Sequence, residues 1–178
     1  MTHRRDLYRY LTLGLGGLMS LVLAVPGMAY LLDPLDTKRR RQRTTDFVTL
    51  ARLSELTPNV ARAFPIIEDR QDAWVKYPRE PVGSVWLIRQ AEGSKTPVIA
   101  FTAECPHLGC SVGLAPEGRS FLCPCHTSAF AFDGERKNEV PPRPMDRLEV
   151  KLSSDSDPDV QVKFQRFRTM EKEMIPLA

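Results

Sequence analysis

The chain has 178 residues, of which 42% are hydrophobic and 26% are charged, a composition typical of globular proteins. This length allows one domain of ordinary size with smaller appended segments. The formal net charge of +3 is too small to indicate nucleic-acid binding, so we expect no nucleic-acid partner. The 15 prolines favour loops and short strands over long helices.

The N-terminal part of the chain predicts a membrane anchor. Residues 1–10 are polar and basic, and residues 11–32 contain no charged side chain. The apolar run slightly exceeds the ~20 residues that cross a bilayer as a helix, and its glycines are tolerated in membrane helices. A cleaved secretory signal is the alternative, but the run is longer than an ordinary signal core and no clear cleavage site precedes a polar mature start. We therefore expect an uncleaved transmembrane helix over residues 11–32.

Two basic groups flank this predicted helix. Arg4-Arg5-Asp6-Leu7, in the tail before it, resembles in part a twin-arginine export signal. Residues 33–46 form a charged link, which is either a solvated stretch at lipid headgroups or a hinge. Because the basic residues of the link outnumber those of the tail, the positive-inside rule alone would keep the following domain in the cytoplasm.

Short apolar runs divided by turn residues follow the link and predict an antiparallel β domain. Pro78, Pro81 and Gly83 are expected to break the connection between two of its strands, and Asp133-Gly134 signals a turn. The last ten residues carry no clear pattern. The expected strands are residues 47–50, 60–67, 85–88, 98–101, 148–152 and 160–167.

Two short boxes hold all four cysteines and two of the three histidines. This concentration of soft ligands indicates a single metal centre. Each box begins with a cysteine followed closely by a histidine, so together the boxes offer two thiolates and two neutral imidazoles. The boxes read Cys105-Pro106-His107-Leu108-Gly109-Cys110 and Cys123-Pro124-Cys125-His126-Thr127-Ser128.

The ligand types favour a binuclear iron centre, with alternatives. Two thiolates suit one iron and two imidazoles suit the other, as in a Rieske cluster. The remaining pair, Cys110 and Cys125, could form a disulfide that clamps the two loops. A Cys2His2 zinc site would use the same four ligands, but it leaves Cys110, Cys125, Leu108 and Ser128 without a role. A framework of two disulfides with idle histidines is the remaining alternative.

At these residues the chain resembles the Rieske iron–sulfur proteins, whose boxes read C-x-H-L-G-C and C-P-C-H-x-S. The resemblance implies an all-β fold, in which a Rieske-type antiparallel domain over residues 47–178 includes a small cluster-binding subdomain at about residues 103–144. One N-terminal transmembrane helix precedes this domain. The implied cofactor is one Rieske 2Fe-2S cluster. The implied ligands are Cys105, His107, Cys123 and His126, and the implied disulfide is Cys110–Cys125.

The resemblance also implies roles for residues around the cluster. Ser128 takes the place of a family serine whose hydroxyl donates to a bridging sulfur. Leu108 takes the place of a side chain that shields the cluster from water. Phe130 stands where high-potential relatives have a tyrosine, so we expect a reduction potential below that of ubiquinol-type centres. Thr127 replaces the family's usual glycine. The segment 141–144 resembles the proline-rich loop that covers the cluster.

The implied function is electron transfer from quinol to a c-type cytochrome, as the iron–sulfur subunit of a bacterial quinol–cytochrome c reductase of the cytochrome bc type. The chain would be the redox subunit of this oxidoreductase and not catalytic alone, with a cytochrome b-type subunit, a c-type cytochrome and quinol as partners. The low expected potential favours menaquinol. The alternatives are the small Rieske subunit of another exported oxidoreductase such as arsenite oxidase, a soluble ferredoxin or oxygenase component, and a zinc-binding membrane module.

The expected location is the bacterial inner (cytoplasmic) membrane, with a single span and the Rieske domain on the extracytoplasmic side. The twin-arginine pair supports this side, because a cluster assembled in the cytoplasm must cross the membrane in a folded protein. The implied disulfide supports it too, since stable disulfides belong to oxidising compartments. The basic link after the helix points the opposite way, and the sequence leaves these signals in conflict.

Overall fold

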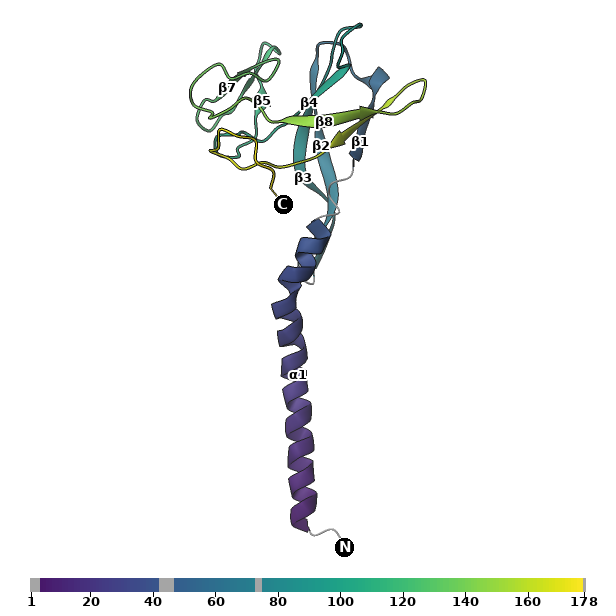
Figure 1. Cartoon of the computed structure of the whole chain (residues 1–178), viewed down its shortest axis with the longest axis vertical. Helices are drawn as coiled ribbons and strands as arrows, with labels where there is room; N and C mark the ends of the chain where they lie inside the picture. Colours follow the sequence, from purple (N-terminus) through teal and green to yellow (C-terminus); the bar gives the residue numbers. More distant parts are fainter. Residues whose placement is uncertain (1–3, 42–46, 73–74, 178) are drawn as a thin grey trace. The chain divides into compact units, whose positions relative to one another are not determined.

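The computed structural model describes residues 4–41, 47–72 and 75–177 of the chain. By its internal contacts the chain divides into two compact units, residues 1–43 and residues 44–178. The first unit is helical and the second is built of antiparallel strands (Figure 1). The expected all-β fold with one N-terminal apolar helix is therefore confirmed.

Helix α1 runs from Arg4 to Arg41 and makes up the first unit. Its part from Arg4 to Leu32 is long and apolar enough to cross a membrane. The large apolar side chains of this part are all exposed in the isolated chain, as a lipid-facing helix requires. The helix is longer than the predicted span and enters the predicted link, of which residues 42–46 lie outside the described residues.

The second unit is organised around a six-stranded sheet, here called the base sheet. Its strands pair antiparallel throughout, in the order β1-β9-β8-β4-β3-β2. A short 3-10 turn, Leu53–Glu55, follows the first strand. The strands are β1 (Phe47–Arg52), β2 (Ala61–Asp72), β3 (Val75–Arg89), β4 (Val98–Thr102), β8 (Arg147–Leu152) and β9 (Asp159–Lys163).

Aliphatic side chains on one face of the base sheet form its core. Val85 and Leu87 in β3 and Val160 and Val162 in β9 are completely buried. In both strands the buried positions are two residues apart, because successive side chains of a strand point to opposite faces.

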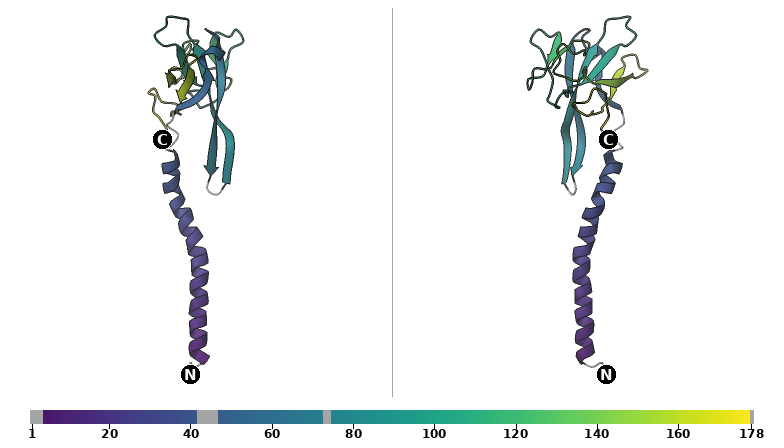
Figure 2. Two further views of the ribbon diagram at one scale, coloured as in Figure 1. Left: turned by 90° about the vertical axis from the view of Figure 1, so that its right-hand side faces the viewer. Right: turned by 60° about the vertical axis from the view of Figure 1, so that its left-hand side comes forward.

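The β2–β3 hairpin is longer than predicted, and the expected break at Pro78, Pro81 and Gly83 is wrong, because all three residues lie inside β3. Strand β4 pairs only with the Val85–Arg89 part of β3, so the preceding part pairs with β2 alone. A strand paired on one side tolerates proline, which lacks an N–H to donate. Two shifts of register in the β2–β3 pairing accompany this stretch, which Figure 2 shows as a narrow two-stranded ribbon.

The final predicted strand is shorter than expected. Strand β9 ends at Lys163, whereas the prediction extended to residue 167. Its neighbour β1 begins at Phe47, which pairs with Lys163, and within the described residues no partner on that side extends further. The predicted turn at Asp133-Gly134 is confirmed, with Gly134 in the left-handed region at φ +90°.

A second, small sheet was not predicted. It consists of β5 (Gly113–Leu114), β6 (Ser120–Leu122) and β7 (Ala129–Ala131), in that order. Its core is aromatic: the rings of Trp86 and Phe121 lie 5.3 Å apart between centroids, and Phe121 and Phe132 are stacked at 6.1 Å. Strands of two or three residues are too short to show an alternating pattern, so only the structure reveals them.

Candidate metal centre

Both cysteine–histidine boxes form loops that close on themselves. In the first box, which follows β4, the Cys105 N–H donates to the Cys110 carbonyl (2.8 Å) and the Gly109 N–H donates to the Cys105 carbonyl (2.9 Å). Gly109 has φ +76°, which glycine adopts without strain. In the second box, which joins β6 to β7, the Cys123 N–H donates to the Ser128 carbonyl (2.9 Å). Each loop is therefore held in shape by its own backbone hydrogen bonds.

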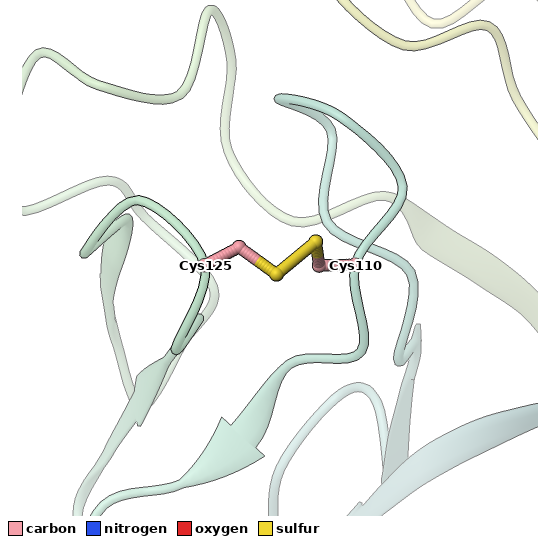
Figure 3. The surroundings of a disulfide bond; sticks show 2 residues. All are labelled: Cys110 and Cys125. Carbon is pink, nitrogen blue, oxygen red and sulfur yellow. A yellow bond between two sulfur atoms is a disulfide. The ribbon is translucent and has the colours of Figure 1, made fainter.

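A disulfide joins the two loops. Cys110 and Cys125 are bonded through their sulfur atoms, with 6.6 Å between their Cα atoms (Figure 3). This pairing is the one that the resemblance implied, and it is confirmed. The bridge leaves Cys105 and Cys123 as the two free thiols of the chain.

The four predicted ligands come together at the joined loops. Cys105 is completely buried and Cys123 is 2% exposed, while His107 is half-buried and His126 is exposed. The two imidazole rings lie 5.0 Å apart between centroids, edge to face. The sulfur of Cys123 also lies within 4.8 Å of both disulfide sulfurs, but these two are bonded to each other and offer no thiolate.

The buried thiols interact with each other. Burial raises the pKa of the Cys105 thiol above its ordinary value, and the neighbouring Cys123 thiol raises it further, while the backbone N–H of His107 acts in the opposite direction. Burial disfavours the charged thiolate because the surrounding protein solvates it poorly. A cation between the two sulfurs would remove this penalty, since a metal binds the deprotonated thiolate.

Ser128 carries a buried hydroxyl without a partner. Its side chain is fully buried, and among the described residues its Oγ makes no hydrogen bond, although it lies close enough to Cys105 to favour the thiolate. Buried hydroxyls nearly always have a partner, so an unpaired one calls for an explanation. An acceptor bound between the loops, such as a sulfide, would satisfy it, and the donor set of the site therefore fits an iron–sulfur cluster.

The other residues singled out in the sequence surround these ligands. Phe130 in β7 is completely buried in the same apolar cluster as Cys105 and Cys123, and it offers no hydroxyl to either sulfur. Leu108 is 51% exposed at the first loop, and Pro141 of the proline-rich segment is fully buried.

An ion pair that the sequence analysis missed includes Arg143 of the proline-rich segment. Arg143 is 5% exposed, and its Nε and Nη2 donate to the two carboxylate oxygens of Asp146 at 2.6 and 2.8 Å. The same guanidinium donates to the backbone carbonyls of Arg168 (2.8 Å) and Glu171 (2.6 Å). A bidentate arginine–carboxylate pair has geometric specificity as well as strength. The spacing Arg-x-x-Asp could have indicated the ion pair from the sequence, but it does not indicate the bonds to the backbone carbonyls of Arg168 and Glu171.

The C-terminal segment, residues 164–177, also contacts the first box. The Met170 N–H donates to the Pro106 carbonyl at 2.9 Å. Arg166 pairs with Glu104, the residue before Cys105, through two bonds of 2.9 and 3.0 Å. The C-terminal segment, whose last ten residues showed no pattern in the sequence, therefore ties the first loop to the proline-rich segment.

Comparisons with known proteins agree with this chemistry. A family model described as "Rieske [2Fe-2S] domain" matches residues 47–151. The chain is 31% identical over 153 residues to the menaquinol:cytochrome c reductase iron–sulfur subunit of Geobacillus thermodenitrificans, covering 84% of this chain and 85% of the relative. The protein of the same description in Bacillus subtilis (strain 168) is 30% identical over 153 residues, covering 84% of this chain and 86% of the relative.

Among solved structures, the crystal structure of a cyanobacterial plasma membrane Rieske protein from Synechocystis has 25% sequence identity and a TM-score of 0.38. The match covers 48% of this chain and 81% of that protein.

Proposed function

Because the chain belongs to the Rieske [2Fe-2S] family, whose model matches more than half of it, we propose that it passes electrons from a quinol to a c-type cytochrome. Its cofactor is one Rieske 2Fe-2S cluster. The observation that carries the proposal is the meeting of two buried free thiols and two neighbouring imidazoles on loops joined by a disulfide. The chain would be the redox subunit of a quinol–cytochrome c oxidoreductase and would not be catalytic alone.

We assign Cys105 and Cys123 as the thiolate ligands and His107 and His126 as the imidazole ligands. Family membership and the proximity of these side chains support this set. A zinc ion could use the same four atoms, but the family model that matches residues 47–151 is described as a Rieske [2Fe-2S] domain, which favours the iron–sulfur cluster.

When bound, the cluster supplies one-electron transfer at a potential that is raised by its two neutral imidazole ligands. The cysteine and histidine side chains have different roles. The buried cysteines would hold iron away from water, and the more exposed imidazoles would form the face that a partner reaches. On each imidazole the ring nitrogen that does not bind iron can accept a proton from a quinol hydroxyl. Proton and electron transfer would therefore take place at the same face.

The partners in this proposal are a cytochrome b-type subunit, a c-type cytochrome and menaquinol. Two relatives that match most of the chain are described as menaquinol:cytochrome c reductase iron–sulfur subunits. Phe130 supports the same donor. Its ring offers no hydroxyl to the buried sulfurs, one hydrogen bond fewer to the site lowers the reduction potential, and menaquinol is the more reducing quinol.

We place the chain in the bacterial inner membrane, with residues 1–10 as the export-signal tail, 11–32 as the span, 33–46 as the link and 47–178 as the Rieske domain on the extracytoplasmic side. The cluster-binding part of that domain would cover about residues 103–144. The observed disulfide supports this side of the membrane, because such bonds persist in oxidising compartments. The twin-arginine pair supports it as well, and the basic residues of the link oppose it.

The test uses bacterial membranes in which this chain, wild type or variant, is the only copy of the subunit. Cytochrome c reduction is followed with a menaquinol analogue and with a ubiquinol analogue as donors. We expect activity with the wild type and with Ser94→Ala, a variant in an exposed loop, and none with Cys105→Ser. Equal activity of Cys105→Ser and wild type would contradict the proposal. If the wild type were active with neither quinol, a quinol would be excluded as the electron donor.

A further inference from the structure

The residue after His126 has an unfavourable backbone conformation. Thr127 has φ +59°, in the left-handed region, where a β-branched residue is a genuine outlier. Its Oγ1 donates to the His126 carbonyl at 2.7 Å, and its side chain is exposed. A strained residue persists only where its surroundings hold it, so some contact must stabilise this turn.

Asn138 supplies that contact. Its Nδ2 donates to the Thr127 carbonyl at 2.8 Å, and its Oδ1 accepts from the Ala129 N–H at 3.3 Å. The side-chain amide satisfies both groups only in this orientation, because one partner is an acceptor and the other a donor. One half-buried side chain therefore bonds to the residue before Ser128 and to the residue after it.

Ser128, the residue between these two contacts, is the one with the unpaired hydroxyl. Its carbonyl accepts from the Cys123 N–H at 2.9 Å, and the Ala129 carbonyl accepts from the Lys137 N–H at 2.8 Å. The first bond ties Ser128 to the start of the box, and the second ties the first residue of β7 to Lys137. Among the described contacts, only the Asn138 side chain also holds the strained Thr127 peptide, which sets the direction from which Ser128 enters the site.

We propose that Asn138 is a positioning residue that aims the Ser128 hydroxyl at the cluster and thereby raises the cluster's reduction potential. This inference rests on the cluster proposed above. The reduced cluster carries one more negative charge than the oxidised cluster, so a hydroxyl that donates to it favours the reduced form. Without Asn138 the Thr127 peptide relaxes and the Ser128 hydroxyl loses its fixed direction.

The test is a double-mutant cycle on the full-length chain in detergent, read as the midpoint potential in an EPR-monitored redox titration. Asn138→Ala should lower the one-electron equilibrium constant for reduction by up to about tenfold, which corresponds to 59 mV. Ser128→Ala should lower it at least as much. In the Ser128→Ala background, Asn138→Ala should change nothing further, because the hydroxyl it positions is gone.

Two controls separate a local effect from general damage. Glu139→Gln alters a neighbouring exposed side chain and should leave the potential unchanged. If Asn138→Ala fails to retain the cluster, Asn138→Asp takes its place in the cycle. This variant keeps the oxygen that accepts from the Ala129 N–H and loses the N–H that donates to the Thr127 carbonyl. The added charge shifts the potential equally in both backgrounds, so Asn138→Asp should lower the potential more in the wild-type chain than in Ser128→Ala, and that difference is the positioning effect.

The outcomes are distinguishable from failure of the proposed function. A cluster signal with an unchanged potential in Asn138→Ala overturns the inference alone. So does an equal shift in the presence and absence of the Ser128 hydroxyl, because Asn138 would then act by another route. A wild-type chain that binds no cluster overturns the proposed function, and the inference with it.

Discussion

The base sheet and the small sheet with its two box loops bury different kinds of side chain. The base sheet buries aliphatic residues of strands that lie far apart in the sequence, such as Val85 and Val160. The small sheet buries aromatic rings together with two free thiols, and its loops are held by a disulfide and by the buried pair of Arg143 and Asp146. The first is stabilised by burial of apolar area, and the second also by specific bonds, namely the disulfide between the loops and the Arg143–Asp146 pair.

This difference indicates which residues can be substituted to change the free energy of unfolding and which to change the reduction potential. A side chain of the aliphatic core of the base sheet contributes to the free energy of unfolding and lies in a different core cluster from Cys105 and Cys123. A side chain of the small sheet contacts groups next to them. Substitutions in the two regions should therefore affect different observables, and four variants would sharpen or break that comparison.

The largest expected effect is loss of the cluster in Cys105→Ser. The hydroxyl is a poor ligand for iron, so iron and acid-labile sulfide should both be absent from the purified full-length chain. Base-sheet strands should remain folded, because their core does not include Cys105. Circular dichroism and metal analysis would check both points, and retention of full iron content would refute the ligand assignment.

Asp146→Ala should destabilise the chain by ~3–5 kcal/mol, because it leaves the Arg143 guanidinium buried without its counter-charge. Denaturant unfolding of the holoprotein in detergent would measure it. The matched control is Arg166→Gln, which breaks a pair that is 55% exposed on the arginine side and should cost ~0–1 kcal/mol. Equal effects of the two variants would mean that the buried pair has no special role.

Leu87→Ala probes the base sheet. Leu87 is completely buried in the aliphatic core, so its truncation should cost ~2–5 kcal/mol in the free energy of unfolding. The reduction potential should stay at the wild-type value, since Leu87 lies in a different core cluster from Cys105 and Cys123. A shifted potential in this variant would show that the two regions are coupled.

How much of this could be read from the sequence differs between the two regions. The strands of the base sheet were predictable as short apolar runs divided by turn residues, although Pro78 and Pro81 hid the length of β3. The disulfide partners were predictable because both cysteines lie in recognisable boxes. The contacts of Arg143 were not predictable. Its partners are the backbone carbonyls of Arg168 and Glu171, which every residue type has, and only the fold brings them to Arg143.

The smallest expected effect is that of Phe130→Tyr. A hydroxyl added beside the buried sulfurs should donate to a ligand thiolate and favour the reduced form, raising the potential by up to about 59 mV, a tenfold change in the one-electron equilibrium. A redox titration of the variant beside the wild type would measure it. A lower potential, with the cluster intact, would disprove the account given for Phe130.

The central claim is that the two boxes hold a Rieske cluster on Cys105, His107, Cys123 and His126. The most direct measurement is a low-temperature EPR spectrum of the ascorbate-reduced full-length chain, with iron, sulfide and zinc determined on the same sample. The account predicts a Rieske signal, iron and acid-labile sulfide in equal amounts, and no zinc. Stoichiometric zinc without such a signal would contradict it.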